Sequence, residues 1–194
     1  MKKVYFYIIG IILLLISFFL DNSIAGFFAD NRIGFFDSLA LFIHGVEGYV
    51  LFLFVFVILL LSNRKKMILP LLLTFIFYLG ATYFLKVLIA RPRPFTKFDF
   101  GDNFPYLGES GINRSFPSGH ATAAASVIRF FEFNRILLWV WIAITILFMF
   151  SRVYLGMHYL SDVVAGFILG YFIGDSGIFL AEKLKRWLKL PKDF

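Results

Sequence analysis

The chain has 194 residues and is strongly apolar, with 60% hydrophobic and 21% aromatic residues, including 28 Phe. A soluble domain averages about 45–50% apolar residues, so this excess excludes a single soluble globule and indicates an integral membrane protein. The absence of Cys excludes disulfides, thiolate catalysis and Cys-bound metals. The net charge of +7 is not evidence for a nucleic-acid partner, because the positions of charges in a membrane protein reflect topology.

The first apolar segment covers residues 4–20 and follows two lysines. With a rise of about 1.5 Å per residue, such a helix spans roughly 25 Å, close to the ~30 Å hydrocarbon core. A signal peptide has a similar pattern, but the polar residues 21–23 follow in place of a small-residue cleavage site. We therefore expect a retained first helix. A polar loop over 21–34 should follow, and then a short amphipathic segment over 34–44 that lies at the interface or packs on the bundle.

Five further apolar segments predict a total of six transmembrane helices in one all-α bundle. These segments cover residues 46–62, 67–88, 118–133, 136–150 and 157–180, the last starting at Met157 or Tyr159. Residues 182–194 resemble a basic amphipathic surface segment. The connection over 89–117 is much longer than a typical loop of about 4–6 residues, so we expect it to carry function. We find no internal repeat and treat residues 1–194 as a single domain.

The distribution of Lys and Arg predicts the orientation. With six spans, both termini share a side, and that side carries twelve of the 19 Lys and Arg residues. We therefore expect a multi-pass protein of the cell (inner) membrane with both termini in the cytoplasm. The other side carries Arg32, Lys86, Arg91, Arg93, Lys97, Arg114 and Arg152. Several of these crowd at the ends of apolar segments, where an anion-binding site requires them and topology does not.

The segment over 151–162 places Arg152, His158 and Asp162 between two apolar segments. Such groups are costly near the membrane interior. In a helix, His158 and Asp162 would share one face because they are four residues apart. A carboxylate beside an imidazole fixes its tautomer and stabilises its cation, so that the other ring nitrogen becomes a useful nucleophile or base. The alternative is an incidental charge pair at a helix start.

A second cationic segment contains Lys86 at the end of an apolar run and Arg93 seven residues later. Pro92 and Pro94 are expected to break the helix between them. Taken alone, these cations are also typical of side chains that snorkel to an interface.

The third segment, residues 116–120, is Phe-Pro-Ser-Gly-His. Ser118 is expected to cap a helix, and Gly119 permits close approach of the backbone. The free N–H groups of a helix N-terminus attract phosphate and other anions. His120 in the first turn is placed to donate a proton to a leaving group, although an ordinary capped helix remains the alternative.

The expected topology brings all three segments to the non-cytoplasmic face of the membrane. Their polar residues would meet there: Lys86, Arg93, Ser118, His120, Arg152, His158 and Asp162. A metal site is disfavoured, because the arginines would repel a cation and a histidine would engage the carboxylate. Covalent phosphoryl transfer is favoured, because the cations neutralise a phosphate, one histidine attacks it and the other protonates the leaving oxygen.

The three segments resemble the type 2 phosphatidic acid phosphatase superfamily. The matching motifs are Lys-x6-Arg-Pro from Lys86, Pro-Ser-Gly-His over 117–120, and Ser-Arg-x5-His-x3-Asp over 151–162. The resemblance covers about residues 67–175, with the core motifs over 86–162. A chain of this length looks like the small prokaryotic members that act on phosphatidylglycerophosphate, undecaprenyl pyrophosphate or lipid A.

This resemblance implies a lipid phosphatase without a metal or other cofactor. His158 would form a phosphohistidine, Asp162 would orient it, and His120 would be the general acid. The residues implied in phosphate binding are Lys86, Arg93, Arg152, Ser118 and the Gly119 backbone N–H. The implied partners are a lipid phosphate substrate and the bilayer.

Several alternatives remain open at this point. Transfer of the phosphate to a second lipid uses the same intermediate as hydrolysis. An anion channel or transporter would also use the cations, but it gains little from the His-x3-Asp pair. Arg91 is expected to face solvent rather than a second phosphate. We expect His44 to be an interface residue and Tyr154 and Tyr159 to serve packing.

Overall fold

The computed structural model describes residues 2–46, 48–101 and 113–189, and these ranges are helical with short connections. The α-helices are α1 (Lys2–Asp30), α2 (Gly34–His44), α3 (Gly48–Leu61), α4 (Ile68–Ile89), α6 (Gly119–Ser126), α7 (Arg135–Tyr154) and α8 (Leu160–Trp187). Single 3₁₀ turns lie at Lys65–Met67, Pro94–Thr96 and Ile128–Phe131. The predicted all-α class is therefore confirmed for the described part of the chain.

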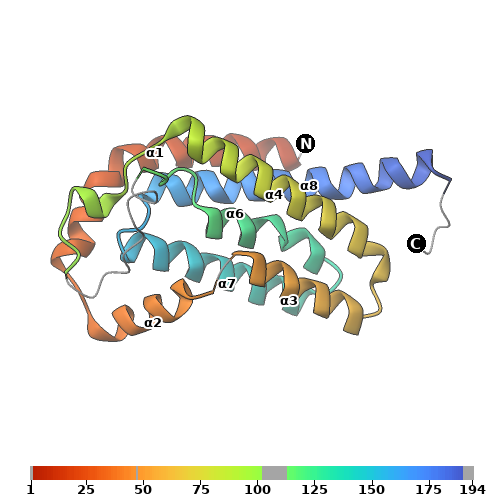
Figure 1. Ribbon diagram of the computed structural model, residues 1–194, viewed down its shortest axis with the longest axis horizontal. Coiled ribbons are helices and arrows are strands. Elements are labelled where there is room, and N and C mark those ends of the chain that lie inside the picture. Colours follow the sequence, from red (N-terminus) through yellow and green to blue (C-terminus); the bar gives the residue numbers. More distant parts are fainter. Residues whose placement is uncertain (1, 47, 102–112, 190–194) are drawn as a thin grey trace.

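Helix α8 is at the centre of the bundle. It packs most extensively against α6, then against α4 and α1. Figure 1 shows the long helices running side by side along one axis, with α6 enclosed among them and α2 at one end of the bundle. The N-terminus of α1 and the C-terminus of α8 lie toward the other end of the bundle, away from α2 (Figure 1).

Small residues explain how closely α6 and α8 approach. Every residue of α6 except His120 is buried, and the helix is built from Gly, Ala, Ser and Thr. Facing it, Gly170 and Gly174 of α8 leave no room for a side chain, because a Cβ there would collide with the carbonyl oxygens of Thr122 and Ser126. Small residues allow this approach between membrane helices, where packing replaces the hydrophobic effect as the driving force.

The number of spans differs from the simple hydropathy pattern. Among the described residues, α1, α4 with its flanking turns, α7 and α8 are long and apolar enough to cross a membrane. Helices α2 and α3, bent by 71° relative to each other, would form a fifth span if taken together. The predicted span over 118–133 consists of the eight-residue α6 and a 3₁₀ turn. Six spans therefore stay a prediction.

The predicted loop over 21–34 is wrong for most of its length, because α1 continues to Asp30. Its first polar residue, Asp21, is only 3% exposed and pairs with Arg91 inside the bundle. An internal ion pair, not solvent, satisfies this carboxylate. The predicted segment over 34–44 is confirmed as α2. The beginning of the predicted surface tail extends α8 to Trp187, and residues 190–194 lie outside the described residues.

Candidate active site

A polar cavity of about 290 Å³ lies near the start of α6, between α4, α7 and the link from α7 to α8. Its lining residues are His44, Tyr78, Thr82, Lys86, Arg93, Gly119, His120, Arg152, Met157 and His158. Six of the eight predicted site residues are among them. The other two, Ser118 and Asp162, are fully buried and joined by a hydrogen bond from the Ser118 amide to the Asp162 carbonyl, 3.0 Å long. The fold therefore brings the three sequence segments together.

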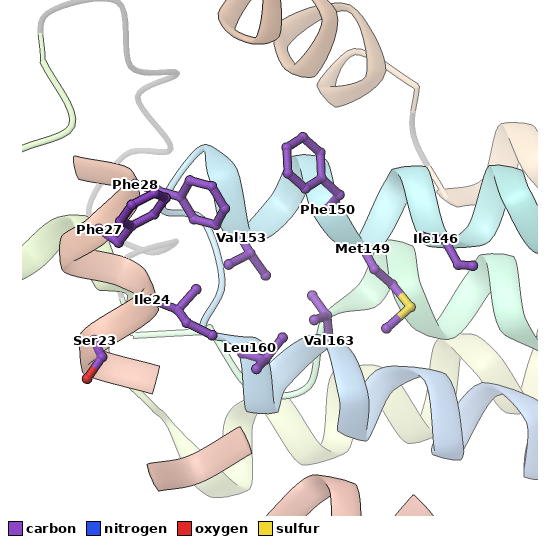
Figure 2. Close-up of a pocket in the computed structure, with 10 residues that line it drawn as sticks. All are labelled: Ser23, Ile24, Phe27, Phe28, Ile146, Met149, Phe150, Val153, Leu160 and Val163. Atoms are coloured by element: carbon purple, nitrogen blue, oxygen red, sulfur yellow. The ribbon is translucent and has the colours of Figure 1, made fainter. Parts of the chain in front are cut away.

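A larger cavity of about 450 Å³ lies between α1, α7 and α8 and is lined almost entirely by apolar side chains. Figure 2 shows Ile24 and Phe28 of α1 on one side, with Met149 and Val153 of α7 on the other. None of the predicted site residues lines this cavity. A phosphate group needs charged and hydrogen-bonding partners, so the smaller, polar cavity is the candidate active site.

The end of α4 directs the segment with Lys86 and Arg93 toward the cavity. The helix stops at Ile89 because Ala90 adopts a left-handed conformation (φ 45°) and two prolines follow. The Lys86 Nζ donates to the carbonyl oxygen of Arg114 at 2.8 Å, and Arg93 Nη1 donates to that of Met157 at 2.8 Å. Carbonyl oxygens hold these cations in place without neutralising them.

The segment over 116–120 begins α6 as the sequence predicts. Ser118 is the N-cap residue, and its Oγ accepts a long hydrogen bond of 3.5 Å from the Ala121 amide. Gly119 follows at the cavity wall, where an added Cβ would be 3.8 Å from the Lys86 side chain. The N-terminus of α6 and the Lys86 ammonium thus approach the same space.

Arg152 of α7 is 1% exposed and is held by the C-terminal end of α2. Its Nη1 is hydrogen-bonded to His44 Nδ1, and its Nη2 donates to the His44 carbonyl oxygen at 3.3 Å. His44, which the sequence suggested to be an interface residue, also lines the cavity. The contact between α2 and α7 is a tertiary contact, and no motif in the sequence predicts it.

His158 lies in the link between α7 and α8 and is 4% exposed. Its Nε2 is 3.4 Å from Arg93 Nη1 on the cavity side. Because a guanidinium can only donate, we infer that Nε2 carries the lone pair and Nδ1 the proton. Burial, followed by the positive charges of Arg93 and Lys86, holds the pKa of His158 well below its ordinary value of 6.5. Both effects favour the neutral form of the imidazole.

Asp162 lies on the other side of this imidazole. His158 Nδ1 is 3.7 Å from Asp162 Oδ2, which is within ion-pair range but longer than a direct hydrogen bond. The same oxygen accepts hydrogen bonds from Ser115 Oγ at 2.5 Å and from the Tyr159 amide at 2.8 Å. Asp162 is thus rigidly held and faces the histidine.

His120 lies in the first turn of α6, with its ring stacked on that of Phe148 at 6.1 Å. Within the described residues, neither its buried Nε2 nor the buried Oγ1 of Thr82 has a hydrogen-bond partner. Both residues line the cavity. Unsatisfied buried polar atoms are rare in proteins, so a bound ligand is the natural partner for them.

Arg91 does not face solvent as expected. Its Nη1 is 2.6 Å from Asp162 Oδ1, and its Nη2 is 2.7 Å from Asp21 Oδ2. Arg93, only two residues away, instead lines the cavity. The two Arg-Pro pairs look equivalent in the sequence, and only the path of the chain after α4 separates them.

The part of the chain that the structure describes contains no group of three or more His, Cys, Asp or Glu residues that could hold a metal ion. Metal independence remains a prediction, because it concerns the reaction. Chelation during an activity measurement tests it directly.

The family model of the PAP2 superfamily matches residues 66–178. This range is more than half of the chain, so the protein belongs to the PAP2 superfamily. The undecaprenyl-diphosphatase of Sulfolobus acidocaldarius is 27% identical over 191 residues, covering 89% of each chain.

Two solved structures share the fold. LpxE of Aquifex aeolicus aligns with a TM-score of 0.67 and 24% identity, over 82% of this chain and 95% of that one. A transmembrane PAP2-type phosphatidylglycerolphosphate phosphatase from Bacillus subtilis gives a TM-score of 0.62 and 23% identity, over 95% and 98% of the two chains. The fold is therefore that of a membrane PAP2 protein.

Proposed function

We propose that the protein is a metal-independent lipid phosphatase that acts through a phosphohistidine at His158. The observation that carries this proposal is the position of His158 Nε2, which faces a cavity lined by Lys86, Arg93 and Arg152. A phosphate in that cavity would be neutralised on several sides and would present its phosphorus to the nitrogen lone pair. The lipid phosphatase relatives support the same chemistry.

In the first step, the Nε2 lone pair forms a bond to phosphorus while the bond from phosphorus to the lipid oxygen breaks. His120 gives a proton to the departing oxygen. In the second step, water attacks the phosphohistidine, His120 takes a proton from the water, and inorganic phosphate leaves. Both histidines then return to their starting state.

Asp162 would balance the positive charge that the phosphorylated imidazole acquires. Its Oδ2 lies 3.7 Å from the proton-bearing Nδ1, and such contacts commonly shorten when substrate binds. Gly119 and Ser118 would complete the anion site through the N-terminus of α6, with the Gly119 amide as a donor. Their roles are part of this proposal.

A lipid substrate fits the surroundings of the cavity. Large apolar side chains are exposed along α1, α3 and α4, where the bilayer would cover them. A phosphorylated headgroup would reach the cations while its tails stay in the bilayer. We place the termini in the cytoplasm and the site of this single-domain, six-span protein on the periplasmic or extracellular face, on the basis of the Lys and Arg distribution.

The test is phosphate release in detergent with EDTA, comparing the wild type with His158→Ala. The substrate panel holds phosphatidic acid, phosphatidylglycerophosphate, undecaprenyl diphosphate and lipid A. We expect activity that persists in EDTA and falls by about 10⁴-fold or more in the variant, as for other nucleophiles. Thermal unfolding of both proteins serves as the folding control. Activity that requires a metal, or that survives the substitution, would contradict the mechanism.

Two outcomes would redirect the proposal while keeping the site. Labelled phosphate that appears on a second lipid, instead of in solution, would identify a phosphotransferase with the same intermediate. Anion flux into vesicles that is unchanged by His158→Ala, with no phosphate release from any substrate, would identify a transporter.

A further inference from the structure

A largely buried cluster of charged and polar side chains adjoins the cavity residue His158 and joins three parts of the chain. It consists of Asp21 from α1, Arg91 after α4, and Ser161 and Asp162 from the start of α8. Asp21 is 3% exposed, whereas Ser161 and Asp162 are fully buried. Groups of this kind are rarely buried in a membrane protein unless they pair and serve a function.

The Arg91 guanidinium holds this cluster together with both of its terminal nitrogens. Nη1 donates to Asp162 Oδ1 and to Ser161 Oγ, each at 2.6 Å, and Nη2 donates to Asp21 Oδ2 at 2.7 Å. Asp21 in turn accepts from the Ser161 amide at 2.8 Å and from its hydroxyl at 2.5 Å. The guanidinium also lies over the Tyr159 ring, 4.2 Å from its centre.

These contacts determine the orientation of the Asp162 carboxylate. Arg91 holds Oδ1, so Oδ2 is the oxygen left to receive Ser115 and to face His158 Nδ1 at 3.7 Å. The positive charge of Arg91 also favours the ionised carboxylate, which would otherwise be costly in the interior. Asp21 fixes Arg91 from the opposite side, so that Nη2 binds Asp21 while Nη1 binds Asp162. A lysine has no planar guanidinium and cannot reproduce this bridge between two carboxylates.

We propose that Arg91 and Asp21 are positioning residues for phosphoryl transfer, because together they hold the Asp162 carboxylate against His158. Helix α1, which lies outside the three sequence motifs, thereby contributes to the site. Arg91 does not line the cavity, so it acts through Asp162 and does not bind a second phosphate. This inference rests on the proposed function of His158.

The experiment measures kcat and KM for Arg91→Met, Arg91→Lys and Asp21→Asn on the substrate that the wild type hydrolyses best. We expect Arg91→Met to lower kcat by about 10–100-fold, as for other residues that orient a reacting group through an intermediate partner, and to change KM by less than about threefold. Asp21→Asn and Arg91→Lys should lower kcat by about 3–10-fold. A phosphate-binding role would appear in KM instead.

A double-substitution cycle separates positioning from a purely structural role. If Arg91 acts through Asp162, adding Arg91→Met to Asp162→Asn should lower kcat by less than about threefold further. Arg129→Met is the matched control. Arg129 pairs with Asp175, which follows Asp162 by thirteen residues in α8, and neither Arg129 nor Asp175 lines the cavity. It should leave kcat unchanged. Rates are referred to folded protein, as measured by thermal unfolding in detergent.

The inference and the proposed function fail in different ways. Activity that survives His158→Ala would overturn the function itself. An inactive His158→Ala protein, combined with wild-type kcat in Arg91→Lys and Asp21→Asn, would overturn only the positioning roles. A full, multiplicative loss from Arg91→Met in the Asp162→Asn background would do the same. If Arg91→Met does not fold, Arg91→Lys, which keeps the charge, replaces it in the cycle.

Discussion

The start and the middle of α8 hold charged groups in different ways. Toward its C-terminal half, Asp175 accepts a hydrogen bond from Arg129, which also pairs with Glu132 at 2.6 Å. Around the start of α8, Arg91 is matched by Asp21 and Asp162. The cavity-lining Lys86, Arg93 and Arg152 donate hydrogen bonds to carbonyl oxygens or to a histidine.

Under the proposed function, this difference separates cations that serve structure from cations that bind the phosphate. An arginine matched by carboxylates adds no net positive charge to its surroundings. Cations held by neutral groups stay fixed in position yet keep their positive potential, which attracts an anion. The polar cavity of the candidate active site lies at the second kind of location.

The sharpest test of this comparison is Arg152→Ala against Arg129→Ala. Loss of Arg152 should lower kcat/KM by about 10²–10³-fold, since a charged donor to the transferring phosphoryl group is removed. Loss of Arg129 should lower the temperature of unfolding and leave kcat/KM within a few-fold of wild type. Equal losses in phosphate release from the two folded variants would contradict the distinction.

The pH dependence of kcat/KM tests the same positive potential through His158. Because its pKa lies well below 6.5, the neutral imidazole should persist at pH 5.5, where an ordinary histidine is about tenfold depleted in this form. Arg93→Met removes a charge that lowers this pKa, so the acid limb should move to higher pH. Titration of the substrate phosphate is common to both enzymes and cancels in the comparison.

The same shift has a consequence for stability. The unfolded chain takes up a proton on this histidine near its ordinary pKa, whereas the folded protein does not. The contribution is therefore present above about pH 6.5 and is lost as the pH falls below it. Thermal unfolding of His158→Gln should lack this component.

The kinetic test has a clear contrary outcome. If the acid limb of kcat/KM lies at pH 6.5 and does not move in Arg93→Met, the pKa of the His158 imidazole is unperturbed.

The smallest effect is expected at His44, which holds Arg152 from α2. His44→Ala should lower kcat/KM by about 3–10-fold, mainly through KM, because Arg152 keeps its charge but loses part of its orientation. His44→Asn places an amide oxygen near the position of Nδ1 and should recover most of the activity. Losses as large as that of Arg152→Ala would instead indicate direct contact between His44 and the substrate.

The candidate site was largely predictable because its residues lie at helix ends that short-range rules identify. Pro92 and Pro94 mark the end of α4, and Ser118 marks the start of α6. His158 lies two residues before α8, so the expected shared helix face is not formed, but its Nδ1 still lies 3.7 Å from Asp162 Oδ2. The family match then confirmed the superfamily that these motifs resemble.

The wrong expectations share a cause. The loop over 21–34 and the solvent-facing Arg91 were both inferred from polarity, which is typical of surfaces. In the structure, Asp21 lies within α1 and pairs with Arg91, so each polar group has a partner inside the protein. Polarity alone cannot separate solvation from a partner supplied by a distant part of the chain.

The sequence by itself therefore determined the membrane class, the all-helical architecture, the superfamily and six residues that line the polar cavity, because these depend on composition and on local spacing. Only the tertiary structure decided that Arg91 joins α1 to Asp162, whereas Arg93 enters the cavity. Only the structure placed the short α6 inside the bundle. Both outcomes depend on close packing between segments such as α1 and α8, whose meeting no local rule encodes.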